Sequence, residues 1–334
     1  MTHAVLIYNP HAGQALVRRE MQNVLAYLAQ SGWQAQLWET TQAGEATALA
    51  RRAVQRGAEV VVAVGGDGTL NEVASGMVGA DAALGVLPVG TTNVWALQMQ
   101  IPALDPISPG GHIAKFVSEL EEQLDEPLPI NHYRATLLRA ARTLVHGRTV
   151  AVDVGQIAGR YFLMWAGIGL DAAITQSVPP AEKRALGSWA FVIPTLDTVQ
   201  EYHSVDVTLT VDDHVLETRT SLIVVSNIQL YGAVLPLGAK ARVDDGLLDV
   251  CIFKGEGLLT FVRHALTVLS QRHMQDPAIE YYQCRRLAVE STHPLPVHAD
   301  DEPFTQTPVV AQVLPQALQV IVPQNAPRDL FSAW

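Results

Sequence analysis

The chain has 334 residues, of which 49% are hydrophobic and only 16% are charged, so it is long enough for two domains and too apolar for extensive disorder. Acidic residues outnumber basic ones by 33 to 22, which gives a net charge of −11 and argues against nucleic acid as a partner. The two cysteines, Cys251 and Cys284, stand in no metal-ligand spacing and are expected to remain reduced thiols.

No pattern in the sequence indicates export or membrane insertion. The first ten residues lack the basic region, apolar core and cleavage site of a signal peptide. The apolar runs, such as residues 60–64, have the length of strands, far short of the roughly 20 residues that cross a bilayer. We therefore expect a cytoplasmic protein without a transmembrane segment.

The first third of the chain alternates between strand-like and helix-like segments. The expected strands are residues 4–8, 34–39, 59–64 and 84–89, and the expected helices are 17–28, 43–55, 70–77 and 93–99. Such alternation predicts a parallel sheet that is covered by helices on both faces. Ligand-binding loops in such sheets follow the carboxyl ends of the strands.

The pattern changes near residue 149. Helices are expected at 112–124 and 133–145, and short β-rich runs then dominate at 150–157, 161–165, 205–211, 216–226, 247–253, 287–291 and 318–322, interrupted by helices at 181–199 and 258–270. We predict a Rossmann-like α/β domain over residues 1–148 and a β-rich, sandwich-like domain over 149–323. The tail, 324–334, is expected to pack back on the first domain.

The clearest chemical signal is GGDGTLNE, from Gly65 to Glu72, which follows a buried strand and opens a helix. Its three glycines let the backbone approach a phosphate, and the helix start offers N–H groups to an anion. Asp67 would repel phosphate unless it holds a divalent cation. The alternative is an ordinary glycine-rich turn. The motif has neither the ending of a Walker loop nor the third glycine of a dinucleotide fingerprint.

Two similar loops follow neighbouring strands. NPHAG covers residues 9–13, after the first strand, and PVGTTN covers residues 88–93, after the fourth. Either could be a plain turn. Three loops at the carboxyl ends of parallel strands would meet at one edge of the sheet, and this convergence favours a nucleotide site.

These three motifs together resemble the diacylglycerol kinase catalytic family, which includes bacterial soluble lipid kinases and the sphingosine and ceramide kinases. The resemblance extends to three later segments, at residues 152–172, 226–250 and 298–304, the last of which reads HADDEPF. The order and spacing of the blocks make the match specific over most of the chain.

The resemblance implies a role for each matching position. An ATP site would be formed by Asn9, Pro10, Gly13, Thr40, Gly65, Gly66, Asp67, Gly68, Thr69, Asn71, Glu72 and Thr91. Asp67 would also organise Mg²⁺ and the phosphates. Glu302 would be the general base, with Asp300 beside it. Arg242, Asp245 and Leu247 match positions that hold a structural Mg²⁺.

The residues themselves are compatible with these roles. Phosphoryl transfer depends on positioning and charge neutralisation, and a carboxylate near the acceptor hydroxyl can serve as base. The neighbouring carboxylates of Asp300 and Asp301 are expected to raise the pKa of that base. Without the resemblance, the same cluster would be interpreted as an acidic surface turn.

Three positions depart from the family pattern. Asp301 stands where the family often has glycine, which indicates a backbone with positive φ. Val94 replaces a frequent aspartate, and Ala12 replaces a serine. The first two substitutions motivate one alternative, a nucleotide-binding regulator without catalysis.

The predicted function is an ATP- and Mg²⁺-dependent lipid kinase of phospholipid metabolism, with a diacylglycerol-like acceptor reached at a membrane surface. A kinase for a soluble acceptor such as NAD is the second alternative, because NAD kinases share the Gly-Gly-Asp-Gly-Thr turn. Peripheral membrane association and a homodimer are arrangements that the sequence allows.

Overall fold

The computed structural model describes residues 1–12, 16–103, 130–177, 202–232 and 235–332. The chain forms two compact units, one of residues 1–151 and 318–327, the other of residues 152–317 and 328–334. The helices expected at 112–124 and 181–199 lie outside the described residues.

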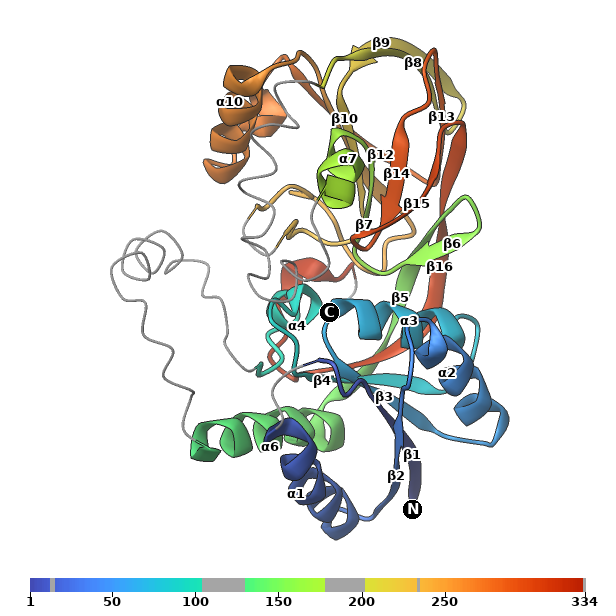
Figure 1. The fold of residues 1–334 in the computed structure, drawn as a ribbon, viewed down its shortest axis with the longest axis vertical. Helices are drawn as coiled ribbons and strands as arrows, with labels where there is room; N and C mark the ends of the chain where they lie inside the picture. The colour runs from blue at the N-terminus through green and yellow to red at the C-terminus, as the bar shows by residue number, and fades with distance from the viewer. Residues whose placement is uncertain (13–15, 104–129, 178–201, 233–234, 333–334) are drawn as a thin grey trace. The chain divides into compact units, whose positions relative to one another are not determined.

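The first unit is built on a parallel sheet (Figure 1). Its strands run in the order β2-β1-β3-β4, and the last residues of β16 pair in parallel with β4. The bounds are β1 Thr2–Tyr8, β2 Trp33–Glu39, β3 Val60–Gly65 and β4 Ala83–Pro88. The strands β3 and β4 are buried along their whole length, as expected of a sheet with helices on both faces.

Among the described residues of this unit, four helices pack in two pairs, α1 with α6 and α2 with α3, on opposite faces of the sheet (Figure 1). The helix bounds are α1 Leu16–Gln30, α2 Glu45–Gln55, α3 Asp67–Met77, α4 Val94–Gln98 and α6 Ile130–His146. In α1, Val17, Met21, Val24 and Leu28 are fully buried, the spacing of one helical face.

The second unit is a sandwich of antiparallel sheets. One sheet has the order β12-β11-β10-β7-β14-β15, and the other joins β9, β8, β13 and β16, with β5 beside β16 and β6 beside β5. The bounds are β5 Arg148–Ile157, β6 Arg160–Phe162, β7 Trp165–Gly169, β8 Val205–Val211, β9 His214–Thr220, β10 Leu222–Ser226, β11 Leu248–Phe253, β12 Ile279–Cys284, β13 Arg286–Ser291, β14 Pro296–Ala299, β15 Glu302–Gln306 and β16 Val309–Val322. Buried residues of both sheets form one core. The fold-class prediction is confirmed.

The helices in the described part of the second unit are α7 Leu170–Ser177, α10 Leu258–Leu269 and two 3₁₀ turns, η2 His273–Gln275 and η3 Arg328–Leu330. None of the helices among the described residues is both long and apolar enough to span a bilayer.

Several strand predictions differ from the structure. The run expected at 216–226 is two strands, β9 and β10, which belong to different sheets. The chain changes sheet at Thr220, whose buried hydroxyl donates to the carbonyl of Phe253 at 2.6 Å. The run expected at 318–322 is the end of the much longer β16. Pro315 and Gln316, whose φ is +49°, interrupt the pattern that would have revealed the strand.

The unit boundaries also differ from the predicted domains. The division falls between residues 151 and 152, three residues after the predicted one, inside β5. Residues 318–327 return to the first unit because β16 pairs there with β4. The tail divides, since residues 328–334 belong to the second unit, where the N–H of Val243 donates to Leu330 O at 2.9 Å.

Candidate active site

Four loops meet at the carboxyl edge of the parallel sheet in the first unit. The N–H of Asn9 donates to Val64 O at 3.1 Å, that of Thr40 to Tyr8 O at 2.9 Å, and that of Val89 to Gly65 O at 3.0 Å. Between side chains, Asn9 Nδ2 donates to Thr69 Oγ1 at 3.1 Å. The predicted convergence of the loops after the strands is therefore present, with Asn9 and Thr69 in direct contact.

The glycines of this edge have two different functions. A Cβ on Gly65 would lie 2.4 Å from the Thr69 side chain, and one on Gly90 would lie 2.5 Å from the Cα of Gly66, so packing between the loops excludes side chains there. A Cβ on Gly68 would meet nothing within 4 Å. Packing therefore does not require Gly68, and its missing side chain leaves the start of α3 open.

The N-terminus of α3 has the properties of an anion site. Its N-cap residue is Gly66, and no side chain caps it. The N–H groups of a first helical turn have no acceptor within the helix, and they carry the positive end of the helix dipole. The helix begins at Asp67, three residues before the predicted start, so that Gly68 and Thr69 lie in this first turn.

Asp67 has protein partners that the sequence did not reveal. Its Oδ2 accepts from the N–H of Val94 at 2.9 Å, and its Oδ1 accepts from that of Trp95 at 3.3 Å. The carboxylate therefore caps the start of α4 and ties the Gly65–Thr69 turn to the loop after β4. An ionised carboxylate has about four acceptor positions, so these two backbone contacts do not by themselves exclude a cation at Asp67.

Other positions of the predicted nucleotide site face different surroundings. The carboxylate of Glu72 accepts from the N–H groups of Gly44 at 2.9 Å and Ala46 at 3.1 Å, so it caps α2. Asn71 is buried, Pro10 and Thr91 are exposed, and Gly13 lies outside the described residues. Val94 is 2% exposed, so an aspartate at that position would place its charge in the interior.

The late carboxylates of the sequence lie on the β14–β15 hairpin of the second unit. Ala299 pairs with Glu302, which leaves a two-residue turn in which Asp300 has φ +43° and Asp301 has φ +64°. Positive φ at both residues defines a type I′ turn, in which glycine is preferred at the second position. The prediction of positive φ at Asp301 is confirmed, and the aspartate retains the tight turn.

Asp300 is buried and fastens this hairpin. Its Oδ2 accepts from the N–H of Leu163 at 2.8 Å, and its Oδ1 accepts from those of Met164 at 3.1 Å and Trp165 at 3.0 Å. Burial raises the pKa of Asp300 to about 7, against the lowering effect of the three N–H donors, and the charge of Asp301 adds to the rise. Asp300 is thus a positioning residue.

Glu302 has a different environment. Its side chain is 48% exposed and forms an ion pair with Arg160, which comes from β6. The Arg160 guanidinium also lies over the ring of Phe304, 5.2 Å from its centre. The carboxylate of Glu302 is thus reachable from solvent and held in place by a fixed cation.

A trio of side chains that the sequence analysis did not identify lies beside the hairpin, with Asp171 and His298 buried and Tyr231 partly buried. His298 Nε2 lies 2.5 Å from Asp171 Oδ2, and the Tyr231 hydroxyl donates to Asp171 Oδ1. A Cβ on Gly167 would collide with both Asp171 and His298. Burial lowers the pKa of His298, but the Asp171 carboxylate, with further carboxylates nearby, raises it overall.

The signal for the trio in the sequence was that each member lies in one of the three later matching segments, residues 152–172, 226–250 and 298–304. The three residues are 60 or more positions apart and come from β14, α7 and the loop after β10, so no spacing rule connects them.

The predicted metal positions lie in the loop before β11. Asp245 Oδ1 accepts from the N–H of Leu247 at 3.0 Å. Burial raises the pKa of Asp245, and the nearby charge of Arg242 opposes the rise. Burial likewise raises the pKa of Asp249 to about 6, with the charge of Asp245 adding to it. Within the described residues, no three His, Cys, Asp or Glu side chains are grouped to hold a metal ion, so a cation here would depend on Asp245 and backbone carbonyl oxygens.

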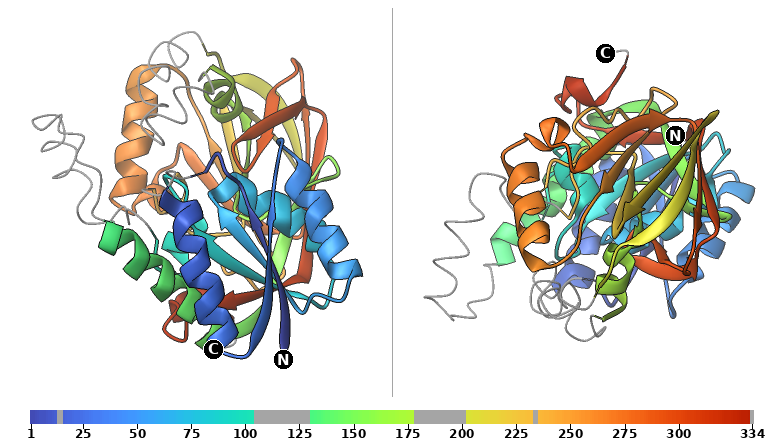
Figure 2. Two further views of the ribbon diagram at one scale, coloured as in Figure 1. Left: turned by 60° about the horizontal axis from the view of Figure 1, so that its bottom comes forward. Right: turned by 90° about the horizontal axis from the view of Figure 1, so that it is seen from above.

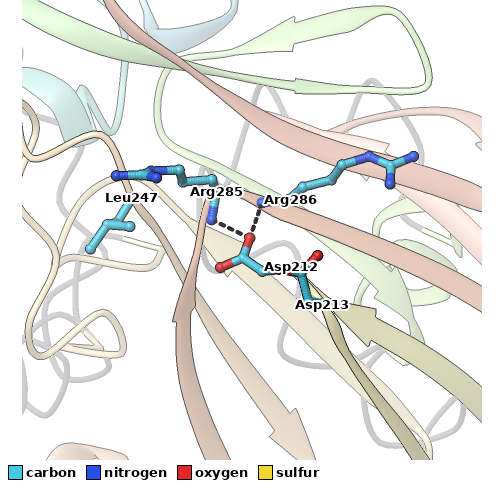
Figure 3. A pocket seen from close by; sticks show the side chains of 5 residues that line it. All are labelled: Asp212, Asp213, Leu247, Arg285 and Arg286. Atoms are coloured by element: carbon cyan, nitrogen blue, oxygen red, sulfur yellow. Dashed lines mark hydrogen bonds between the residues drawn. The ribbon is translucent and has the colours of Figure 1, made fainter.

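Leu247 also lines a small polar pocket with Asp212, Asp213, Arg285 and Arg286 (Figure 3). Asp212 Oδ1 accepts from the backbone N–H groups of Arg285 and Arg286, each at 2.9 Å. The two guanidinium groups extend away from this carboxylate in different directions (Figure 3). The contacts fix the turn between β12 and β13 and do not assemble a catalytic group.

Comparisons with known proteins find a match for each of the two units. Residues 3–125 match the model of the diacylglycerol kinase catalytic domain, and residues 165–322 match that of the YegS C-terminal NAD kinase beta sandwich-like domain. A diacylglycerol kinase of Bacillus subtilis is 28% identical over 332 residues, covering 99% of each chain. A diacylglycerol kinase of Staphylococcus carnosus is 26% identical, over 96% of this chain and 95% of its own.

The fold has solved relatives as well. A putative diacylglycerol kinase from Bacillus anthracis superposes with a TM-score of 0.76, covering 97% of this chain and 96% of its own at 22% identity. An α/β catalytic domain followed by a NAD-kinase-type sandwich defines a two-domain kinase. Residues 3–125 thus belong to the diacylglycerol kinase catalytic-domain family, as the sequence motifs indicated, and the chain is similar over nearly its full length to proteins named diacylglycerol kinase.

Proposed function

We propose that this protein transfers the γ-phosphoryl group of ATP, with Mg²⁺, to the free hydroxyl of a diacylglycerol. The observation that carries the proposal is the open, uncapped N-terminus of α3 among four converging loops, in a chain that matches diacylglycerol kinases over nearly its full length. Because diacylglycerol is a bilayer lipid, the protein would work at a membrane surface from the cytoplasm.

The first unit would hold the nucleotide. The N–H groups of the first α3 turn would donate to phosphate oxygens, and Gly68 leaves the space for their approach. Asn9 and Thr69, joined by their hydrogen bond, would orient the same group. Asp67 is the carboxylate at this turn that fits Mg²⁺, which commonly uses one or two carboxylates together with substrate phosphates. Mg²⁺ bound there would neutralise charge on the phosphates.

The second unit would supply the base. The Glu302 carboxylate would take the proton of the acceptor hydroxyl. The hydroxyl oxygen would bond to the γ-phosphorus while the bond between that phosphorus and the β,γ-bridging oxygen, which leaves with ADP, breaks. The products are ADP and the lipid phosphate, and the proton leaves Glu302 to solvent. Asp300 holds the hairpin that carries Glu302, and Arg160 holds the carboxylate itself.

We also propose a structural cation at Asp245. The carboxylates of Asp153, Asp245 and Asp249 all have a pKa raised by burial, and each is raised further by a neighbouring carboxylate. A divalent cation bound by Asp245, with backbone carbonyl oxygens near Arg242 and Leu247, would relieve this repulsion. A fall in melting temperature on adding EDTA, reversed by Mg²⁺ and absent in Asp245→Asn, would support it.

The assay compares acceptors side by side. Purified protein is incubated with radiolabelled ATP, Mg²⁺ and either dioleoylglycerol in mixed micelles or NAD. We expect label in the lipid and none in NADP. Glu302→Gln should lower turnover by about 10² or more while leaving ATP binding unchanged. Full activity of this variant would refute Glu302 as base. ATP binding without turnover on either acceptor would instead favour the regulator.

A further inference from the structure

The helix α10 of the second unit is apolar on more than one side. Of its twelve residues, only Thr260, Arg263, His264 and Thr267 are not apolar. Its inner side is covered: Leu258 and Phe261 pack against a buried cluster that contains residues of α7, and Val268 is 2% exposed. The helix, orange in Figure 2, lies to one side of the strands of the second unit in both views.

The outer side of α10 exposes large apolar side chains. Leu259 is 87% exposed, Leu266 61%, Leu269 46% and Val262 44%. Their spacing of three, four and three residues places them in one stripe. Met274, 38% exposed in the following η2 turn, is close to them in sequence. We name these five residues the α10 face.

This concentration is unusual within the protein. Among the described residues, only Met1 and Val215 are further large hydrophobic side chains with comparable exposure. Single exposed apolar residues need no explanation, whereas a contiguous group marks an interaction surface. Most of the exposed apolar side chains therefore belong to one surface.

The charged side chains within the segment that carries the α10 face are basic. From residue 257 to 275 there is no aspartate or glutamate, although the whole chain has a net charge of −11. Arg263 and Arg272 line the same shallow hollow as Leu259, Val262 and Leu266. Asp276 neutralises part of this charge by its salt bridge with Arg263 at 2.9 Å. Arg272 takes part in no salt bridge of the described residues.

A further cation lies near η2. The centre of the Tyr281 ring lies 6.4 Å from the centre of the ring of His273, in η2, and 5.9 Å from Lys240 Nζ. Lys240 is exposed. The α10 face thus combines leucines on an outward helical stripe with basic side chains at its border, the composition of helices that lie in a bilayer interface.

We propose that the α10 face docks this protein on a bilayer that contains anionic phospholipids. The inference rests on the proposed function in that a kinase for a bilayer lipid must reach that bilayer. A second copy of the chain fits the surface less well. A two-fold contact would place the same patch against itself, and with it the basic border against an identical basic border.

The test measures vesicle binding without ATP or diacylglycerol, so its result does not depend on catalysis. The double variant Leu259→Gln/Leu266→Gln is compared with the wild type and with Val215→Gln, a control at another exposed apolar residue. Sedimentation uses vesicles of phosphatidylcholine alone or mixed with phosphatidylglycerol. We expect the wild type and the control to bind the mixed vesicles at least about tenfold more tightly than the double variant, with binding weakened by salt.

Three outcomes would overturn the proposal. They are a wild type that binds neither vesicle, a double variant that binds as the wild type does, and a wild-type dimer that the double variant converts to a monomer. Activity on a short-chain, water-soluble diacylglycerol separates this inference from the proposed function. The double variant should keep that activity and lose about tenfold on vesicle-bound substrate. A wild type that binds vesicles but phosphorylates neither substrate would refute only the kinase assignment.

Discussion

Removing the carboxylate of Asp300 should destabilise the second unit and should reduce activity only through that change. The side chain accepts hydrogen bonds from three successive backbone N–H groups, at 2.8, 3.1 and 3.0 Å. Asp300→Ala would leave these buried donors without their acceptor. Each such group costs about 1–3 kcal/mol, so the three together should lower the free energy of unfolding by about 3–9 kcal/mol.

Asp300→Asn is the milder change. The amide oxygen can replace Oδ1, which accepts from Met164 and Trp165, but the amide nitrogen would then face the N–H of Leu163. The hydrogen bond from Leu163 would be lost, and its N–H would face the amide N–H₂ of the new asparagine. We expect this to lower the free energy of unfolding by about 1–3 kcal/mol. The difference between Asn and Ala therefore tests the hydrogen-bond geometry itself.

The same residue should make stability depend on pH. Because burial raises the pKa of Asp300 from 3.8 to about 7, the folded state holds a proton that the unfolded chain releases. The contribution of this group is therefore complete below about pH 4, falls as the pH rises, and levels off above about pH 7. Asp300→Asn cannot titrate, so this component of the slope should disappear.

Urea denaturation, followed by tryptophan fluorescence at several pH values, measures both effects. Asp213→Ala removes an exposed carboxylate and serves as the control. Glu302→Gln, at a side chain that is 48% exposed, should leave stability unchanged while lowering turnover. An Asp300→Ala variant within about 0.5 kcal/mol of the wild type would refute the buried anchoring role.

Three further substitutions test other parts of the structure. Gly68→Ala should preserve or slightly raise stability, since its Cβ meets nothing within 4 Å and alanine favours a helix, yet weaken ATP binding about tenfold or more by calorimetry; unchanged binding would contradict the anion site. Asp301→Gly should stabilise the protein by about 0.5 kcal/mol in urea, because φ is +64°; a loss of stability would show that the carboxylate matters more than the turn. Arg134→Met should cost about 2 kcal/mol at neutral pH because it leaves the Glu20 carboxylate, 1% exposed, without its cation. The hydrogen bond from Arg134 holds the pKa of Glu20 below 4.5, so this difference should shrink as the pH falls below about 4.5, and an equal cost at all pH values would contradict it.

Local patterns in the sequence were sufficient for much of the first unit. The alternation of buried strands and helices predicted the parallel sheet, and the glycine-rich motif was correctly placed between β3 and α3. The strands of the second unit were harder to predict from the sequence. β14 and β15 are only four and five residues long, and the periodicity of such short segments carries little information.

The roles of individual carboxylates could not be inferred in the same way. Asp67 and Asp300 were assigned to the reaction and Glu72 to the ATP site, and the structure shows that each accepts backbone N–H groups from another element. Hydrogen bonds of this kind join residues 26 to 137 positions apart. No window of sequence contains both partners.

The sequence alone indicated the family of the first domain and the position of the glycine-rich turn between β3 and α3, because glycine requirements and hydrophobic periodicity are properties of neighbouring residues. It also indicated the positive φ at Asp301, because the residue type that the family prefers there reflects backbone conformation. The tertiary structure decided which acidic groups anchor the fold and which remain accessible, and it revealed the contact of Asp171 with Tyr231 and His298. Burial and pairing depend on chain segments that only folding brings together.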